Sequence, residues 1–247
     1  MYFKLIGCDV FTRELCLAVA SSPHTVDLDF TEKGSHDNSG RLHALIQEKI
    51  DAAHESGKDY DAVLLGYGLC GNSTRGLSSK SSKLVIPRAH DCCTIFLGSK
   101  ESFKKHFAEN PSRQFTSAGY MERGEGYLKT STFSKEMGID KSYEEYVELY
   151  GEENARYIME TLDPLLKAGT EDSIIYIEVP ETEVLDFKHR CREEAEREGK
   201  EFLCISGNIR LLKDMIHGNW NEDDFLILEP EERIVPVYDW DEIIRKG

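Results

Sequence analysis

The sequence predicts an α/β fold with two lobes, each built on a parallel sheet of Rossmann-like or flavodoxin-like strand order; one continuous mixed sheet is the alternative. Two observations predict this class. Short apolar runs alternate with amphipathic helical patterns in both halves of the chain, which is typical of strand–helix–strand units. Two of the runs, residues 62–67 and 83–87, are apolar almost throughout, as in strands that are buried on both faces.

The first lobe is expected to span residues 1–110. Strands are predicted at residues 2–8 and 26–30, the second because apolar and polar residues alternate there. A helix follows the first strand. A second helix follows the second strand and carries a clear apolar stripe, made of Leu42, Leu45, Ile46, Ile50 and Ala53. The two apolar runs then supply two more strands.

Residues 111–141 are interpreted as a connecting segment or lid, because glycines interrupt a polar stretch. Residues 142–247 are expected to form the second lobe. This lobe begins with a capping box of Ser142 and Glu145 that opens a helical region. Helices and strands then alternate again, with strands predicted at residues 173–179, 202–205, 225–228 and 233–237, and helices at residues 184–195 and 211–216.

The composition excludes several functions. The chain of 247 residues has 30 Lys and Arg against 46 Asp and Glu, a formal net charge of −16. Such a surface repels phosphate backbones and anionic lipid, so neither nucleic acid nor a membrane is an expected partner. No run approaches the roughly 18 apolar residues of a membrane span, and the start lacks signal-peptide features. We expect a cytoplasmic protein whose seven cysteines are free thiols or ligands.

The cysteines fall into two classes. Cys16 and Cys191 lie on apolar faces of predicted helices, so we expect them to be buried packing residues. The other five end or follow predicted strands, where ligands bind in open α/β sheets; they are Cys8, Cys70, Cys92, Cys93 and Cys204.

A zinc site is the leading interpretation of these strand ends. His90 and Cys92 are two residues apart in a predicted turn, and Cys70 lies in the glycine-rich loop after the neighbouring strand. Imidazole and thiolate are ligands that zinc prefers, and three protein ligands leave a fourth position open for chemistry. The same loop has the Gly-x-Gly-x-x-Gly spacing of dinucleotide sites, but it follows the third strand rather than the first, so we favour the metal.

Further side chains are assigned around this metal. If Asp91 caps the next helix, Cys92 and Cys93 lie in its first turn, where the helix dipole lowers thiol pKa values. We expect Asp91 and Cys93 to be catalytic, and to line the open side of the metal with Cys8 and Cys204. The candidates for binding substrate are Arg75, Arg88, Asn72 and Asn208. Surface ion pairs are the alternative role for the two arginines, and a helix cap is the alternative for Asn208.

Several stretches resemble an uncharacterised family called domain of unknown function 1638. Residues 65–72 and 86–92 are similar to its two signature motifs, and residues 207–212, 218–220 and 225–226 to its C-terminal motif. The resemblance covers nearly the whole chain. Members are often encoded beside corrinoid-dependent methyltransferases in methanogens and other anaerobes, which implies a link to one-carbon metabolism. The chain departs from the family pattern at Cys93, where an aliphatic residue is commoner, and at Pro230-Glu231-Glu232, where a Pro-Gly turn is commoner.

The residues and the resemblance together suggest a metal-dependent protein of anaerobic one-carbon metabolism. It would activate a thiol or handle a methyl group with corrinoid methyltransferases, as a zinc-dependent methyl or thiol transferase acting on a small-molecule substrate. His90-Asp91-Cys92 is similar to the His-x-Cys of zinc enzymes that methylate thiols, although the further cysteine here comes earlier in the chain.

Two alternatives stay open. In the first, Cys8, Cys70 and Cys92 hold an iron–sulfur cluster with one open iron. In the second, the chain is a non-catalytic accessory protein or a partner of a corrinoid carrier. Direct carriage of a corrinoid is not expected, because the Asp-x-His-x-x-Gly corrinoid fingerprint is absent from the sequence.

Overall fold

A computed structural model describes residues 1–33, 35, 38–110, 113, 115–123, 147–148, 151–152, 155–156, 173–237 and 239–247. The predicted capping box at Ser142 and Glu145 and the greater part of the predicted connecting segment lie outside these residues. The described residues contain two larger sheets, one short antiparallel pair and the helices that pack on the larger sheets.

The first sheet has five strands in the order β2-β1-β3-β4-β8. The first four are parallel, and β8 pairs antiparallel with β4. Their bounds are β1 Tyr2–Cys8, β2 Thr25–Thr31, β3 Ala62–Gly66, β4 Lys83–Pro87 and β8 Phe225–Leu228. All five residues of β3 are buried, as the apolar run predicts for a central parallel strand.

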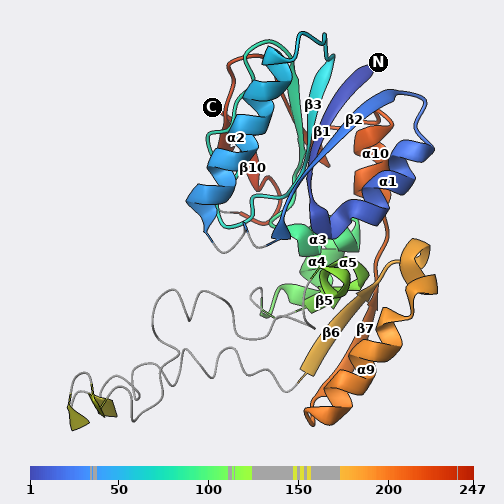
Figure 1. The fold of residues 1–247 in the computed structure, drawn as a ribbon, viewed down its shortest axis with the longest axis vertical. Coiled ribbons are helices and arrows are strands. Elements are labelled where there is room, and N and C mark those ends of the chain that lie inside the picture. Colours follow the sequence, from blue (N-terminus) through green and yellow to red (C-terminus); the bar gives the residue numbers. More distant parts are fainter. Residues whose placement is uncertain are drawn as a thin grey trace.

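Helices cover both faces of this sheet, as Figure 1 shows. Helices α1 (Thr12–Ala20) and α10 (Arg210–Ile216) pack together on one face. Helix α2 (Ser39–Glu55) covers β1 and β2 on the other face. It begins at Asn38, whose side chain accepts a hydrogen bond from the Arg41 N–H, and its buried residues are Leu42, Ile46, Ile50 and Ala53. Four of the five residues of the predicted stripe are thus buried.

The second sheet has three parallel strands in the order β5-β6-β7. They are β5 (Phe115–Ser117), β6 (Ser173–Glu178) and β7 (Glu201–Ser206), with α9 (Phe187–Arg197) packed on β6 and β7. Between the two sheets lie α3 (Cys92–Leu97), α4 (Lys100–Phe107) and α5 (Ala118–Glu122) (Figure 1). The fold is therefore α/β with parallel strands in two sheets, and the first sheet is mixed because of β8.

The two sheets are less separate than the predicted lobes. The buried apolar cluster of the first sheet also includes two residues of β6, Ile175 and Ile177, and Val179, which follows β6. Strand β8 and helix α10 come late in the chain but pack on the first sheet, so residues 142–247 do not make one lobe. Strand β5, inside the predicted connecting segment, belongs to the second sheet. The chain ends in an antiparallel pair, β9 (Ile234–Pro236) with β10 (Ile244–Lys246).

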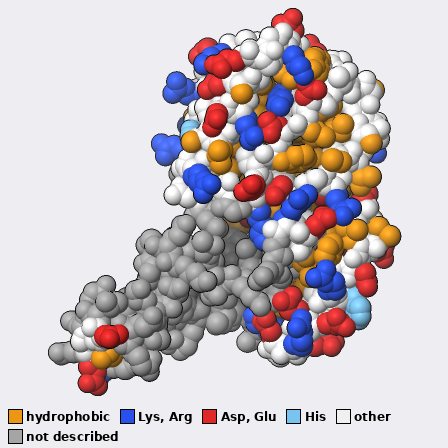
Figure 2. All heavy atoms as spheres, viewed as in Figure 1, with side chains coloured by type: hydrophobic (Ala, Val, Ile, Leu, Met, Phe, Trp, Pro, Cys, Tyr) orange, Lys and Arg blue, Asp and Glu red, His pale blue; other side chains and the backbone are white. Residues whose placement is uncertain are grey.

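Charges of both signs are distributed over the surface. On the face seen in Figure 2, Lys and Arg side chains are scattered among Asp and Glu side chains, with apolar side chains between them. In the described part of the chain, no helix combines the length and the apolar character that crossing a bilayer requires.

Candidate thiol site

Three cysteines gather at the carboxyl edge of the first sheet. Cys8 is the last residue of β1, Cys70 follows β3, and Cys92 is the first residue of α3, which follows β4. Strands β1, β3 and β4 are neighbours in the sheet and run parallel. Their carboxyl ends therefore meet at one edge, which is where open α/β sheets bind ligands.

The loop after β3 lies directly along the loop after β4. The Leu69 N–H donates to the Ala89 carbonyl at 2.8 Å, and the Cys70 N–H donates to the His90 carbonyl at 2.9 Å. Gly68 permits this approach, because a Cβ there would lie 2.7 Å from the Ala89 carbonyl oxygen and 2.8 Å from the Asp91 nitrogen. The paired loops thus bring Cys70 beside the start of α3.

Cys70 has a backbone conformation that favours glycine. Its φ is 47°, and Gly71 and Asn72 follow with φ values of 61° and 70°. A non-glycine residue in this left-handed region costs about 1 kcal/mol or more. Residues held in such conformations cluster at functional sites. Position 70 thus carries a thiol where the backbone favours a residue without a side chain.

The three thiols interact electrostatically. Burial raises the pKa of Cys8 to about 12, and it also raises the pKa values of Cys70 and Cys92 well above the ordinary value of a thiol. Charge on Cys8 raises the pKa of both other thiols, and charge on Cys70 raises the pKa of Cys92. Backbone N–H groups oppose this: that of Val10 acts on Cys8, and those of Gly68 and Cys92 act on Cys70. The three thiols are thus within electrostatic reach of one another, Cys8 and Cys92 are buried and Cys70 is partly buried, and two of the thiols have N–H donors.

Two tyrosines accompany the thiols. The Tyr120 hydroxyl, from α5, is hydrogen-bonded to the Cys92 sulfur at 2.6 Å. The Tyr67 hydroxyl is hydrogen-bonded to the Thr31 hydroxyl at 2.8 Å. Charge on Cys8 and Cys70 raises the pKa of both phenols, which places both rings within the electrostatic reach of the thiols.

Asp91 has the capping role that the sequence predicts. Its side chain accepts a hydrogen bond from the Thr94 N–H at 3.2 Å, at the start of α3. The expected acidification of Cys92 and Cys93 is wrong in sign: the pKa values of both thiols are raised, because burial outweighs the helix terminus. The carboxylate of Asp91 also raises both pKa values. The first turn of α3 therefore holds neutral thiols in the absence of a bound cation.

The side chain of His90 points to a different neighbourhood. Its ring centroid lies 5.2 Å from that of Phe103 and 5.3 Å from that of Trp240. Burial and the charge of Lys104 lower its pKa. Cys70 is bonded to the backbone of this residue rather than to its ring. Across the described residues, no three His, Cys, Asp or Glu side chains are already arranged to hold a metal ion.

The predicted substrate-binding residues are dispersed, and two of them bond to the backbone. Arg88 donates to the carbonyl oxygens of Glu222 and Ile244. Asn208 donates to the Leu97 carbonyl at 3.2 Å and accepts from the Arg210 N–H, a local contact of the helix-cap kind. Arg75 and Asn72 are exposed in the glycine-rich loop.

The remaining cysteines divide differently from the prediction. Cys191 is fully buried, as predicted, but Cys16 is exposed, so its assignment as a packing residue is wrong. Cys204 is also exposed and lies within β7, where its thiol donates to Glu178 at 3.7 Å. Cys93 is buried in α3. Cys204 therefore belongs to the second sheet and is separate from the three cysteines at the edge of the first sheet.

The comparisons with known proteins give a family and nothing more specific. Residues 30–216 match the family described as a protein of unknown function (DUF1638). The chain belongs to this family. Comparisons with the curated proteins and with the solved structures give no significant match. At Pro230-Glu231-Glu232, Glu231 adopts a φ of 71°, in the left-handed region that favours glycine.

Tyr120 is the site residue that reasoning from the sequence missed in this DUF1638 protein. It belongs to α5, beside the second sheet, and it reaches thiols that belong to the first. Lys33 lies above its ring, with the ammonium 5.3 Å from the ring centroid. No local pattern marks an isolated tyrosine, so only its position after β5 and its aromatic neighbours identify it.

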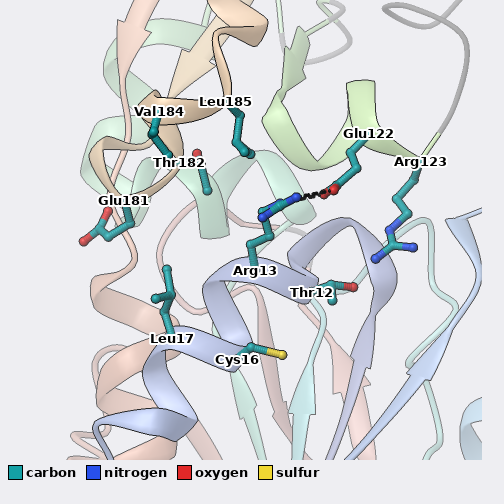
Figure 3. Close-up of a pocket in the computed structure, with 10 residues that line it drawn as sticks. All are labelled: Thr12, Arg13, Cys16, Leu17, Glu122, Arg123, Glu181, Thr182, Val184 and Leu185. Atoms are coloured by element: carbon teal, nitrogen blue, oxygen red, sulfur yellow. Dashed lines mark hydrogen bonds and ion pairs between the residues drawn. The ribbon is translucent and has the colours of Figure 1, made fainter.

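A separate surface pocket lies behind α5. Its volume is about 510 Å³, and α1, α5 and the 3₁₀ helix η3 (Pro180–Leu185) supply its walls. Figure 3 shows Arg13 reaching across it to Glu122, with the two groups 2.5 Å apart. The exposed thiol of Cys16 lies in this pocket. The pocket of the DUF1638 chain therefore contains a thiol, but not one of the three gathered at the sheet edge.

Proposed function

We propose that this chain is a metal-dependent protein that activates a thiol or handles a methyl group, and that Cys8, Cys70 and Cys92 hold its metal. One observation carries the proposal: the three cysteines stand at three neighbouring strand ends on the carboxyl edge of the sheet, and the Cys70 loop is hydrogen-bonded to the backbone just before Cys92. This ligand set replaces His90 with Cys8, because the His90 ring packs against Phe103 and Trp240.

The donor chemistry fits a soft metal. Thiolates are preferred ligands of zinc and of iron–sulfur clusters. A cation at this position would offset the burial that keeps the three thiols protonated. Because no three ligands are prearranged around one point in the described residues, metal binding requires the thiol side chains to turn toward a common centre. Three ligands would leave one position open for a substrate.

The strand order supports a ligand at this edge. The parallel strands follow the order β2-β1-β3-β4, which is the beginning of the flavodoxin-like order. The order reverses between β1 and β3, and ligands of such sheets bind at that point. Cys8 ends β1 and Cys70 follows β3, so two of the three thiols flank the reversal.

The chemistry proposed for the site is thiol alkylation. A bound zinc ion would keep a small thiol deprotonated and nucleophilic near neutral pH. With a methylated corrinoid as donor, the cobalt–carbon bond breaks, a carbon–sulfur bond forms, Co(I) leaves, and the thiol proton is released. The corrinoid partner is proposed from the family resemblance, whereas the thiol site rests on the described residues.

An iron–sulfur protein is the second candidate. It is favoured by the ligand set itself, because three thiolates without a histidine suit a cubane cluster with one open iron. Such a protein would activate a substrate at that iron instead of at zinc. The two candidates use the same three cysteines and differ in the metal.

Purification without oxygen separates the candidates. Bound zinc without visible absorption supports the zinc protein, and a brown colour with iron and sulfide supports the cluster. We expect the variants Cys8→Ser, Cys70→Ser and Cys92→Ser each to lower metal occupancy about tenfold or more. Cys204→Ser and His90→Gln are the matched controls and should keep the metal. If His90→Gln loses the metal and the Cys8 variant keeps it, the ligands are Cys70, His90 and Cys92 instead. If the wild-type protein contains no metal, the proposal is refuted.

Methyl transfer is measured separately. The zinc-loaded protein is mixed with a methylated corrinoid and a small thiol, and the corrinoid absorption and the thioether product are followed. Zinc-dependent thioether formation supports a transferase. A protein that binds metal at the three thiols but gives no thioether would be an accessory protein rather than an enzyme.

A further inference from the structure

The thiol site is completed by a residue from beside the second sheet. Cys8, Cys70 and Cys92 belong to the edge of the first sheet, whereas Tyr120 belongs to α5. The Tyr120 hydroxyl lies 2.6 Å from the Cys92 sulfur. This contact joins residues 28 positions apart in sequence, and it needs α5 to be held in place against the first sheet.

Close packing fixes the position of Tyr120. The preceding residue, Gly119, lies so near the 3₁₀ helix η1 (Asp9–Phe11) that a Cβ would overlap the Val10 carbonyl oxygen. The Tyr120 ring lies edge-on to Phe115, with the ring centroids 5.5 Å apart, and tilted against Phe96 at 6.2 Å. The ring therefore cannot turn away from Cys92 without a rearrangement of its neighbours.

We propose that Tyr120 is a positioning residue of the thiol site, and that its hydroxyl donates a hydrogen bond to the Cys92 sulfur and restricts the orientation of this side chain. This inference rests on the proposed function. A thiolate can only accept hydrogen bonds, whereas a phenol can donate. In metal sites, hydrogen bonds to the ligands fix ligand orientation and tune the metal, and removing one typically costs 10- to 100-fold in affinity.

The hydrogen-bond partner of Cys92 is a side chain from another part of the fold. Backbone N–H groups act on Cys8 and Cys70. For Cys92, the Tyr120 hydroxyl at 2.6 Å is the hydrogen-bond partner. Lys33 places a positive charge over the Tyr120 ring, 5.3 Å from the ring centroid. Each of the three sulfurs thus has a hydrogen-bond donor, and the donor to Cys92 is the one that comes from beside the second sheet.

Cobalt(II) binding tests the proposal, because thiolate-to-cobalt bands report the sulfur ligands directly. The metal-free protein is titrated with Co(II) without oxygen, and the variant Tyr120→Phe is compared with the wild-type protein. We expect Tyr120→Phe to bind Co(II) about 10- to 100-fold more weakly. We also expect its thiolate bands at longer wavelength, because loss of the hydrogen bond raises the energy of the sulfur electrons.

Tyr67→Phe is the matched control. It removes a hydroxyl from a neighbouring phenol that is hydrogen-bonded to the Thr31 hydroxyl at 2.8 Å. We expect its Co(II) bands to stay at the wild-type position. If the bands and affinity of Tyr120→Phe equal those of the wild-type protein, or if Tyr67→Phe shifts the bands equally, the positioning role of Tyr120 is refuted.

A metal-free measurement separates this inference from the proposed function. The S–H stretching band of Cys92 is assigned by the difference between the Raman spectra of the wild-type protein and Cys92→Ser. Tyr120→Phe should shift this band and Tyr67→Phe should not. A wild-type protein without cobalt–thiolate bands would refute the metal site, whereas an unshifted Raman band would refute the Tyr120 contact.

Discussion

Both sheets carry cysteines in this protein, but they surround them differently. At the edge of the first sheet, Cys8 and Cys70 have backbone N–H donors as well as carboxylate neighbours, Asp9 and Asp91, and Cys92 is hydrogen-bonded to a phenol. In the second sheet, the Cys204 thiol is exposed and donates to the carboxylate of Glu178. A neighbouring carboxylate disfavours the thiolate in both sheets, whereas the backbone N–H donors favour the thiolate at Cys8 and Cys70.

The difference arises from position along the strand. Cys8 ends its strand and Cys70 and Cys92 lie beyond theirs, where loops turn back and present backbone N–H groups. Cys204 lies inside β7, where the N–H groups of the ladder are engaged by β6. A cysteine at the carboxyl edge of a parallel sheet therefore has free backbone N–H groups nearby as donors, whereas the N–H groups around a cysteine within a strand are used by the sheet. Substitutions can test this contrast. We expect the largest effect on the free energy of unfolding at the contact between α5 and the first sheet.

The contact between α5 and the first sheet depends on a glycine. Gly119→Ala would force a Cβ into the Val10 carbonyl oxygen, and we expect it to lower the free energy of unfolding by about 3 kcal/mol. It should also displace Tyr120 from Cys92. Urea unfolding measures the first effect, and the cobalt–thiolate bands measure the second. Gly40→Ala in α2, which has space for a methyl group, should not destabilise the protein.

Glu14 is expected to make the free energy of unfolding depend on pH. It is 1% exposed on α1, and both its carboxylate oxygens lack a hydrogen-bond partner among the described residues. Burial raises its pKa to about 7, with Glu122 and Glu181 adding to the rise and Arg13 opposing it. The folded protein therefore favours the neutral acid, whereas the unfolded chain releases this proton near its ordinary pKa of about 4.3.

The difference between the pKa values of Glu14 in the folded and unfolded states fixes the direction in which stability changes with pH. As pH rises from about 4.3 to about 7, the unfolded state loses the proton first, so the free energy of unfolding falls by about 3 kcal/mol. Glu14→Gln should remove this fall, so the variant gains stability relative to the wild-type protein as pH rises through that window. Urea unfolding at pH 4, 5.5 and 7.5 tests it; a pH-independent difference between the two proteins would contradict the expectation.

Cys191 sharpens the contrast between a packing thiol and a site thiol. It belongs to α9 and is fully buried, in a small apolar cluster at the second sheet that also contains Ile174 and Tyr176. We expect Cys191→Ser to lower the free energy of unfolding by about 1–2 kcal/mol, because it buries a hydroxyl in an apolar place. Metal occupancy should be unchanged. Loss of metal from a folded Cys191→Ser protein would contradict the separation of the two regions.

The smallest effect is expected at the exposed cysteines. Cys16→Ser and Cys204→Ser should each change the free energy of unfolding by less than about 0.5 kcal/mol. In the native protein these two thiols should react with iodoacetamide before Cys8 and Cys92, which are buried. Mass spectrometry of the labelled peptides gives the order. Rapid labelling of Cys92 in the folded protein would mean that Tyr120 does not cover its sulfur.

Much of the fold is encoded locally and could be predicted. The buried run of β3 and the stripe of α2 have the periodicity of their elements, since one strand is covered on both faces and one helix on a single face. The placement of Cys8, Cys70 and Cys92 could be predicted equally, because parallel strands bring their carboxyl ends to one edge. The family membership is also carried by local motifs.

Only the tertiary structure decided which side chains meet at that edge. The His90 side chain turns toward Phe103 and Trp240, 13 and 150 residues later in the chain, and the spacing of His90 and Cys92 does not encode that choice. Tyr120 and the late strand β8 reach the first sheet through contacts distant in sequence. Periodicity specifies which face of an element is buried, whereas the partners of a side chain depend on elements that the local sequence does not contain.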